Sequence, residues 1–396
     1  MTTYVIIGGG LAGAKAAQTL REEGFDGEVV VIAAEAERPY ERPPLSKDYL
    51  RGKSEKSGIY VHEPSWYDDN RVDLRLDVVA TEIERAAREV RLSDGTRQPY
   101  DKLLIATGAT PRPLPVAGAE RALYLRTAAD SEALKEAFAA GGEVVIAGAG
   151  WIGLETAAAA AEAGCSVTVV ESAPAPLVHA LGPELGEVFA GVHRGHGVRL
   201  RTGEEIAEVR RGSVLLRGGE ELAADHVIAG IGAAPNDRIA RAAGLEVADG
   251  VLVDQSLRSS DPDVFAAGDV ANAFNPLYGR RIRVEHWANA LNGGPAAARA
   301  MLGREVVYDR VPYFYTDQFE LGMEFSGDVA GHDEVVYRGS VADLEFIAFW
   351  LHAGRVVAGM NVNVWDVAGD VQKLIRAGTP VDVKRLTDPS VPLSDL

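Results

Sequence analysis

Short apolar runs recur along the chain, and several of them end in glycine. Residues 4–7 (Tyr-Val-Ile-Ile) run into a glycine-rich segment at 8–13, and residues 144–147 run into a second one at 148–153. A short apolar run that ends at turn residues is typical of a buried strand in a parallel sheet. Helical patterns follow both segments, the first over about 11–23. The pattern therefore predicts two strand-turn-helix units.

Both glycine segments fit the pattern G-x-G-x-x-G. The first glycine permits a tight turn, the second lets a pyrophosphate approach the backbone, and the third lets the helix pack on the strand. Phosphate groups then lie at the positive end of the helix. Two such segments predict two bound dinucleotides. The glycines are Gly8, Gly10 and Gly13 in the first segment and Gly148, Gly150 and Gly153 in the second.

An acidic residue follows the second strand of each unit. Glu35 follows the predicted strand 28–33, and Glu171 follows the predicted strand 167–170. A carboxylate at this place accepts hydrogen bonds from ribose hydroxyls and repels a 2′-phosphate. No arginine stands in the five positions after Glu171. The second unit is therefore predicted to prefer NADH to NADPH, while in the first either Ala34 or Glu35 makes the contact.

Three more apolar runs lead into small or acidic residues. Residues 103–105 precede Ala106-Thr107-Gly108, residues 227–229 precede Gly230-Ile231-Gly232, and residues 264–266 precede Ala267-Gly268-Asp269. Strands that end this way bring bare backbone, and in the last case a carboxylate, to a bound ligand.

The remaining segments predict a loop, a hairpin and a further domain. Three prolines within 38–47 predict a rigid extended loop, which carries the cations Arg38, Arg42 and Lys47. Asp94-Gly95 is a hairpin turn signal within 74–105. Residues 313–396 resemble strands followed by a helix at about 368–377.

Composition narrows the class of protein. A chain of 396 residues predicts two or three domains, and its net charge of −18 argues against a nucleic-acid partner. No apolar stretch reaches the roughly 18 residues of a membrane span. We see no basic, apolar leader, so we expect a cytoplasmic protein that does not bind membranes. An acidic protein partner would need a local basic patch, such as Arg280, Arg281 and Arg283, or Lys373 and Arg376.

Cysteine content excludes thiol chemistry beside a cofactor. Cys165 is the only cysteine, so neither an intrachain disulfide nor a C-x-x-C pair can form. We expect Cys165 to be a small buried residue in a reducing compartment.

The motifs together resemble the FAD-dependent NADH:ferredoxin reductases of oxygenase systems, the putidaredoxin reductase type. The resemblance covers essentially the whole chain. It rests on the two glycine turns, Arg-Pro-Pro-Leu-Ser-Lys at 42–47, Ala-Thr-Gly at 106–108, Tyr-Leu-Arg-Thr at 124–127, Ile-Ala-Gly-Ile-Gly at 228–232, Ala-Gly-Asp at 267–269 and Ser-Val-Pro-Leu at 390–393.

This resemblance implies an α/β fold with two Rossmann-like dinucleotide-binding domains, glutathione-reductase-like, and an α+β C-terminal domain. The implied domains are an FAD-binding domain at 1–110 and 235–312, an NADH-binding domain at 111–234 and a C-terminal domain at 313–396. The resemblance further implies that electrons pass from NADH through FAD to a [2Fe-2S] ferredoxin, which serves a cytochrome P450 or a Rieske-type oxygenase.

The resemblance also implies roles for particular residues. Lys47 pairs with Glu155 near the flavin, and this pair is the expected catalytic element. The residues expected to bind FAD are Gly8, Gly10, Leu11, Ala12, Gly13, Ala34, Glu35, Arg42, Lys47, Val79, Ala80, Ala106, Thr107, Gly108, Arg126, Gly268, Asp269, Glu285, His286 and Trp287. Those expected to bind NADH are Gly148, Gly150, Trp151, Ile152, Gly153, Glu155, Glu171, Gly230, Ile231 and Gly232.

No metal site is expected. His193 and His196 have a spacing that could suit a metal, but they lack acidic or cysteine neighbours, so we expect exposed histidines at a helix end. Other functions on the same scaffold stay open: a rubredoxin reductase, an NADH oxidase or diaphorase, and a redox-switched flavoprotein of the apoptosis-inducing-factor type.

Overall fold

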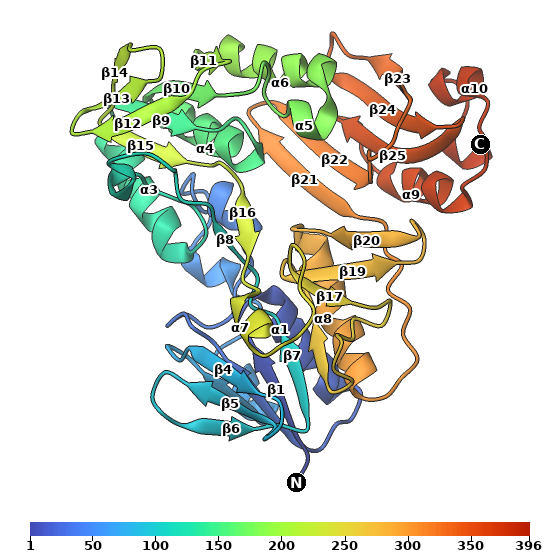
Figure 1. The fold of residues 1–396 in the computed structure, drawn as a ribbon. Coiled ribbons are helices and arrows are strands. Elements are labelled where there is room, and N and C mark those ends of the chain that lie inside the picture. The colour runs from blue at the N-terminus through green and yellow to red at the C-terminus, as the bar shows by residue number, and fades with distance from the viewer. The chain divides into compact units, whose positions relative to one another are not determined.

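A computed structural model describes residues 1–396, and the chain divides into two compact units (Figure 1). The chain passes between the units five times, and two of these passages lie within the short paired strands β8 (Ala109–Pro111) and β16 (Ala233–Pro235). Unit 1 consists of residues 1–41, 56–110 and 234–312. Unit 2 consists of residues 42–55, 111–233 and 313–396.

Unit 1 is built on a five-stranded parallel sheet in the order β18-β7-β1-β2-β3. Its middle strands are apolar and buried along almost their whole length, as expected for a parallel sheet covered on both faces. Helices α1 and α8 pack closely on each other. A Cβ on Gly294 of α8 would lie only 2.2 Å from the Ala12 carbonyl oxygen of α1. The strands are β1 (Thr3–Ile7), β2 (Glu28–Ile32), β3 (Val72–Arg75), β7 (Lys102–Ile105) and β18 (Val264–Ala266); the helices are α1 (Leu11–Glu22) and α8 (Trp287–Met301).

Two small sheets complete unit 1. The antiparallel meander β4-β5-β6 contains the predicted hairpin turn, with Gly95 at a φ of 85°. The second sheet has the order β17-β19-β20. Their strands are β4 (Ala80–Glu84), β5 (Glu89–Leu92), β6 (Arg97–Pro99), β17 (Val251–Val253), β19 (Ala271–Asn275) and β20 (Arg280–Arg283); the short helices are η2 (Lys56–Ile59), α2 (Trp66–Asp69) and α7 (Arg238–Ala242).

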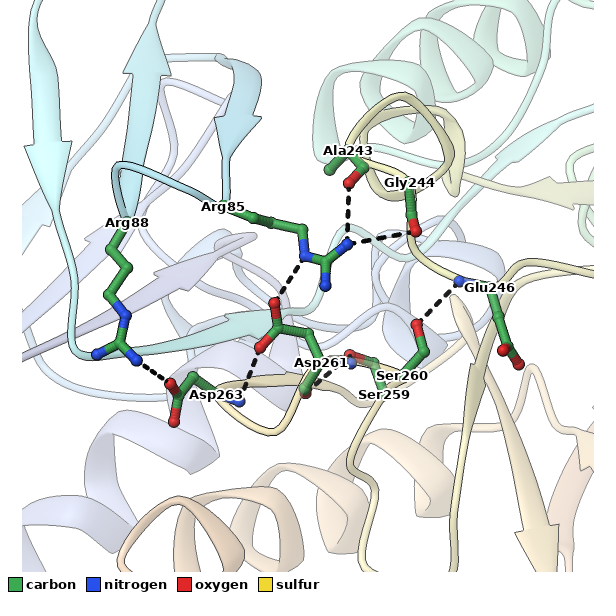
Figure 2. A network of polar contacts seen from close by, with 9 residues as sticks. All are labelled: Arg85, Arg88, Ala243, Gly244, Glu246, Ser259, Ser260, Asp261 and Asp263. Atoms are coloured by element: carbon green, nitrogen blue, oxygen red, sulfur yellow. Dashed lines mark hydrogen bonds and ion pairs between the residues drawn. The ribbon is translucent and has the colours of Figure 1, made fainter.

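A polar network ties the meander to the loop that precedes β18 (Figure 2). Arg85 Nε lies 2.6 Å from the Asp261 carboxylate, and Arg88 lies 2.5 Å from the Asp263 carboxylate. The Arg85 guanidinium also donates to the carbonyl oxygens of Ala243 and Gly244, at 3.4 Å each. Arg85 therefore connects the meander to two later segments, at 243–244 and at 261.

Unit 2 contains a four-stranded parallel sheet in the order β11-β10-β9-β15 and an antiparallel meander, β12-β13-β14. The strands are β9 (Glu143–Ala147), β10 (Ser166–Glu171), β11 (Arg199–Thr202), β12 (Ile206–Arg210), β13 (Ser213–Leu216), β14 (Glu221–Ala223) and β15 (His226–Ala229). The helices are η1 (Pro43–Ser46), η3 (Ala119–Arg121), α3 (Ala128–Ala140), α4 (Trp151–Glu162), α5 (Val178–Leu181) and α6 (Pro183–Gly195).

The C-terminal part of unit 2 is an antiparallel sheet of five strands in the order β21-β22-β25-β24-β23. Phe346, Phe349 and Trp350 are fully buried in it. Its strands are β21 (Tyr313–Gln318), β22 (Leu321–Gly327), β23 (Glu334–Ser340), β24 (Glu345–His352) and β25 (Arg355–Val362), followed by α9 (Ala368–Ala377), α10 (Val383–Thr387) and η4 (Leu393–Asp395). The predicted helix at 368–377 is confirmed.

The expected α/β class, with two parallel sheets and an α+β C-terminal part, is confirmed, whereas the four-part domain division stays a prediction. The loop at 38–47 is not extended throughout, since Pro43–Ser46 form a short helical turn. A proline at the start of a helix needs no N–H partner and already has the helical φ. None of the helices is both long and apolar enough to cross a membrane.

Candidate functional site

The first glycine turn lies at the carboxyl end of β1, between its two neighbouring strands. The Gly8 N–H donates to the Ile32 carbonyl at 2.8 Å, and the Ala106 N–H donates to the Ile7 carbonyl at 2.8 Å. Gly8 has a φ of +124°, and a Cβ there would lie 2.1 Å from the Ala106 carbonyl oxygen. The fold itself therefore requires glycine at position 8.

Gly13 and Gly10 have different reasons to be glycine. A Cβ on Gly13 would lie 2.1 Å from the Gly8 carbonyl oxygen, so helix α1 could not pack here with any other residue. Gly10 has an extended backbone, with a φ of −86°, and a Cβ there would meet no protein atom within 4 Å. Open space over Gly10, at the start of α1, fits a pyrophosphate that approaches the backbone.

The residues expected at the adenosine end lie near the end of β2. Glu35 is half-buried and accepts a hydrogen bond from the Tyr40 hydroxyl, whereas Ala34 is exposed. The Val78 N–H donates to the Ala33 carbonyl at 3.0 Å, which holds the next segment beside this strand. There Val79 is 46 % exposed, just before the half-buried Ala80. A large apolar side chain exposed at a strand end suits a flat ring.

Thr107 and Gly108 are held by Asn236. The Asn236 side chain donates to the Thr107 carbonyl at 2.8 Å, the Thr107 hydroxyl donates to the Asn236 carbonyl at 2.9 Å, and the Asn236 N–H donates to the Gly108 carbonyl at 2.9 Å. Sequence reasoning missed this role of Asn236. An asparagine after a strand and a proline was the available signal.

The segment after β18 lies against α1. A Cβ on Gly268 would lie 3.2 Å from the Ala12 Cβ, and the Asp269 carbonyl accepts a hydrogen bond from Arg283 at 3.4 Å. Arg283 also pairs with Glu285. His286 and Trp287 begin helix α8, and burial lowers the pKa of His286 to about 4, so this ring is neutral at neutral pH.

Unit 2 repeats this glycine geometry. Gly148 has a φ of +96°, and a Cβ there would lie 2.5 Å from the Gly230 carbonyl oxygen; a Cβ on Gly153 would lie 2.0 Å from the Gly148 carbonyl oxygen. At Gly150 the nearest atom to a Cβ is 3.9 Å away. The middle glycine again faces open space, which fits a second dinucleotide.

Residues next to this turn also suit a ligand. Ile152 is 42 % exposed, one of few large apolar side chains in the chain to be so. Trp151 packs edge-on against Phe189 and Phe314, with ring centroids 5.6 and 4.9 Å away. Gly232 has a φ of +94°, and its carbonyl accepts the Arg112 N–H at 2.8 Å. Trp151 is held by aromatic packing, and the neighbouring Ile152 is exposed at the turn, where a ligand could contact it.

The Glu171 carboxylate is fixed at the turn by two backbone amides. Its Oε2 accepts the Ala149 N–H at 2.7 Å, and its Oε1 accepts the Ala173 N–H at 2.7 Å. A carboxylate offers about four acceptor positions, so acceptor capacity is left for ribose hydroxyls. The predicted ribose contact thus has a pre-oriented acceptor.

The expected Lys47–Glu155 pair is present in unit 2. Lys47 Nζ donates to Glu155 Oε1 at 2.5 Å, and Thr316 Oγ1 donates to the same oxygen at 2.5 Å. The Ser46 hydroxyl donates to Oε2. Glu155 is 3 % exposed, and burying a carboxylate requires such donors. Sequence reasoning missed Ser46 and Thr316, since neither lies in a motif with Glu155.

Arg42 and Arg126 are also brought together in unit 2. The Arg42 guanidinium donates to the Arg126 carbonyl oxygen. The Arg126 N–H donates to the Asp130 carboxylate at 3.0 Å, and Asp130 forms a capping box with Thr127 at the start of α3. The helix cap therefore fixes the backbone that Arg42 contacts.

The expectation for His193 was wrong. His193 is fully buried, and its Nε2 lies 2.9 Å from Gln318 Oε1. His196 is exposed as expected; its ring stacks on Phe319 at 3.9 Å between centroids. Helix α6 turns His193 inward because its apolar face packs against the rest of unit 2.

The predicted site residues thus form two sets that belong to different units. Unit 1 holds the first glycine turn, Ala34, Glu35, Val79, Ala80, Ala106 to Gly108, Gly268, Asp269 and Glu285 to Trp287. Unit 2 holds Arg42, Lys47, Arg126, the second glycine turn, Glu155, Glu171 and Gly230 to Gly232.

Comparison with known proteins covers the whole chain. Residues 2–294 match the pyridine nucleotide-disulphide oxidoreductase family, and residues 313–396 match the reductase C-terminal family. The chain is 39 % identical to the anthranilate 1,2-dioxygenase system ferredoxin–NAD(+) reductase component of Burkholderia cepacia, covering 98 % of each chain. It is 36 % identical to putidaredoxin reductase of Pseudomonas putida, covering 99 % of this chain and 96 % of that one.

A solved structure is similar throughout. The covalent putidaredoxin reductase–putidaredoxin complex matches with a TM-score of 0.96 and 36 % identity, covering 100 % of this chain and 97 % of that one. The similarity therefore extends over both glycine turns and the C-terminal sheet.

Proposed function

The chain belongs to the pyridine nucleotide-disulphide oxidoreductase family, and we propose that it reduces a [2Fe-2S] ferredoxin with electrons from NADH. Family membership implies the two expected cofactors, FAD and NADH, and confirms the expected class, an oxidoreductase. The ferredoxin would in turn serve a cytochrome P450 or a Rieske-type oxygenase. The similarity of this chain to the reductase component of a dioxygenase system and to a putidaredoxin reductase supports this acceptor.

Bound FAD would supply the redox chemistry, namely a site that takes up a hydride from NADH and passes the two electrons on one at a time to a one-electron carrier. In unit 1, the amides at the start of α1 would bind its pyrophosphate, and Glu35 its ribose. Val79 would cover the adenine ring. Asn236 fixes Thr107 and Gly108 as a rigid backbone for the remaining contacts. These residues would bind and orient FAD, and none of them needs to take part in a chemical step.

In unit 2, the amides at the start of α4 would bind the NADH pyrophosphate. Glu171, already fixed by the Ala149 and Ala173 amides, would accept the ribose hydroxyls. A phosphate in place of a hydroxyl would meet a carboxylate, so NADPH would bind poorly. Lys47 and Glu155 would orient the nicotinamide and set the local charge.

One observation carries the proposal: two glycine turns leave open space over Gly10 and Gly150 in a chain without a reactive thiol. Cys165 is the only cysteine; it is buried, and burial raises the pKa of its thiol. Electrons that arrive from NADH therefore have no cysteine pair in the chain to reduce, and leave to an external acceptor.

Reduction of cytochrome c tests the proposal. Purified protein is mixed with NADH and cytochrome c, with and without a [2Fe-2S] ferredoxin. The proposal predicts a rate that rises in proportion to ferredoxin and is near zero without it. A rate that does not depend on ferredoxin would favour an NADH oxidase or diaphorase. Reduction that requires rubredoxin would favour a rubredoxin reductase. Slow reduction with every carrier would favour a redox-switched protein of the apoptosis-inducing-factor type.

A further inference from the structure

A line of buried polar side chains leads away from Glu155 inside unit 2. Thr316 and Gln318 alternate along strand β21, so both point to the same face, and each is at most 1 % exposed. Gln318 Nε2 donates to Thr316 Oγ1 at 3.1 Å, and Thr316 Oγ1 donates to Glu155 Oε1 at 2.5 Å. His193 Nε2 lies 2.9 Å from Gln318 Oε1. Four side chains from α4, β21 and α6 thus form one connected line.

The direction of every hydrogen bond in this line is determined. An ionised carboxylate only accepts, so the single Thr316 proton points to Glu155. The Thr316 oxygen then accepts from the Gln318 amide nitrogen. The Gln318 oxygen is left to accept, so His193 must carry its proton on Nε2. All donors point toward Glu155, and the buried Nδ1 of His193 carries no proton and has no hydrogen-bond partner.

Burial supports the neutral ring. Burial is the largest cause and lowers the pKa of His193, and the neighbouring His196 lowers it further; the hydrogen bond to Gln318 and the charge of Glu320 oppose this shift but are weaker than burial. A charged ring would carry a second proton on the unpartnered Nδ1, which is costly away from water. His193 is therefore a neutral end to the line.

We propose that Thr316, Gln318 and His193 are positioning residues that hold the Glu155 carboxylate in one orientation toward Lys47. This inference rests on the proposed function, because the orientation matters only where the pair acts on the nicotinamide. An amide such as Gln318 does not pass protons readily, so the line fixes a charge and does not conduct a proton.

Thr316 and Gln318 are polar residues at buried positions of β21, where apolar residues are usual. Thr316 pairs with Met323 of the neighbouring strand, a buried apolar residue. Polar side chains on such a face are stable only when each hydrogen bond is made. The network supplies these bonds, which explains why threonine and glutamine occur where apolar residues would pack.

Two variants of Thr316 test the inference. Thr316→Val keeps the shape and removes the hydroxyl, whereas Thr316→Ser restores it. Stopped-flow reduction of the bound flavin at saturating NADH should slow by about tenfold in Thr316→Val, the effect of about one lost hydrogen bond. Thr316→Ser should recover most of the rate. Flavin content and the Kd for NADH should stay unchanged.

Thr168→Val is the matched control, since Thr168 is a buried threonine of the same unit away from this line. It should be reduced like the wild type. Reduction of Thr316→Val at the wild-type rate would overturn the inference, and so would equal slowing in Thr168→Val.

A second measurement does not depend on activity. In the wild-type holoprotein, nitrogen-15 NMR of the histidine rings, with His193→Gln for assignment, should show a proton on Nε2 of His193 and none on Nδ1. A proton on Nδ1, or on both nitrogens at pH 7, would overturn the inference even if Thr316→Val fails to fold. Absence of flavin reduction by NADH in the wild type would instead contradict the proposed function.

Discussion

The Lys47 ammonium donates to the Glu155 carboxylate at 2.5 Å, although 108 positions separate the two residues in sequence. Their side chains are 11 % and 3 % exposed. Loss of one partner leaves the other charge buried and unpaired, which costs about 3–5 kcal/mol. The pair therefore links the turn that follows Pro43 to helix α4.

Lys47→Ala should slow reduction of the flavin by NADH and lower the stability of the protein. We expect a loss of rate of about tenfold or more, and a fall in the free energy of unfolding of up to about 3–5 kcal/mol. Stopped-flow kinetics and urea denaturation measure these effects. Lys53→Ala is the control, because Lys53 is 60 % exposed. A wild-type reduction rate in Lys47→Ala would contradict the role given to the pair.

Gly150→Ala and Gly153→Ala should fail in different ways. A Cβ at Gly150 meets no atom closer than 3.9 Å, so this variant should fold, bind flavin and lose affinity for NADH. A Cβ at Gly153 would lie 2.0 Å from a carbonyl oxygen, so this variant should be strongly destabilised. Thermal unfolding and NADH titration separate the two. Normal NADH binding by Gly150→Ala would argue against a pyrophosphate at this turn.

Glu171→Gln should weaken the preference for NADH over NADPH. The variant keeps the shape and one of the two acceptor oxygens, loses the hydrogen bond from one of the two backbone N–H groups, and removes the charge that repels a 2′-phosphate. We expect the KM for NADH to rise about tenfold, because hydrogen bonds to a charged group are worth about 1.5–3 kcal/mol. Glu143→Gln, at the opposite end of the same sheet, is the control. An unchanged ratio of the two kcat/KM values would remove Glu171 from the ribose site.

Arg85→Ala should destabilise unit 1 more than Arg91→Ala. Arg85 joins Asp261 to two backbone carbonyls and is about one-third exposed (Figure 2). Arg91 pairs with glutamates on the surface of the same meander. We expect a loss of about 1–3 kcal/mol for Arg85 and at most about 1 kcal/mol for Arg91. Equal midpoints in urea would contradict the tethering role.

Stability should fall as the pH drops from 6.5 toward 4. Burial lowers the pKa of His62 to about 4, from an ordinary value of 6.5. Between pH 6.5 and about 4, the unfolded chain binds more protons than the folded one, so a falling pH favours the unfolded chain. The stability that depends on a neutral His62 is therefore complete above pH 6.5 and is lost progressively as the pH falls toward 4. His62→Gln should flatten the dependence of the melting temperature on pH. His352→Gln, at an exposed site, should not; equal slopes for all three proteins would contradict the assignment.

The parts of the site that follow a local pattern were predictable. Each glycine turn sits directly between a strand and a helix, so its place in the fold could be predicted from neighbouring residues. The Lys47–Glu155 pair was expected only through the resemblance, because no local rule connects residues so far apart. The glycine fingerprint predicts a pyrophosphate site, but it could not predict which backbone amides fix the Glu171 carboxylate.

Residues whose role depends on packing were missed. His193 lies on the buried face of helix α6, whereas His196 follows the last helical residue, Gly195, and is exposed. No local pattern links Thr316 or Gln318 to Glu155; only the tertiary fold places Thr316 against Glu155 and Gln318 against Thr316. The helical turn at Pro43–Ser46 was missed because consecutive prolines usually predict the absence of a helix. Proline is, however, also common at the first position of a helix, as it is here.

Anaerobic flavin spectroscopy tests the central claim most directly. One equivalent of NADH should bleach the flavin absorbance of the purified protein, and a [2Fe-2S] ferredoxin should then restore it while the ferredoxin becomes reduced. Flavin that NADH does not bleach, or that stays reduced in the presence of ferredoxin, would contradict an electron path from NADH through FAD to this carrier.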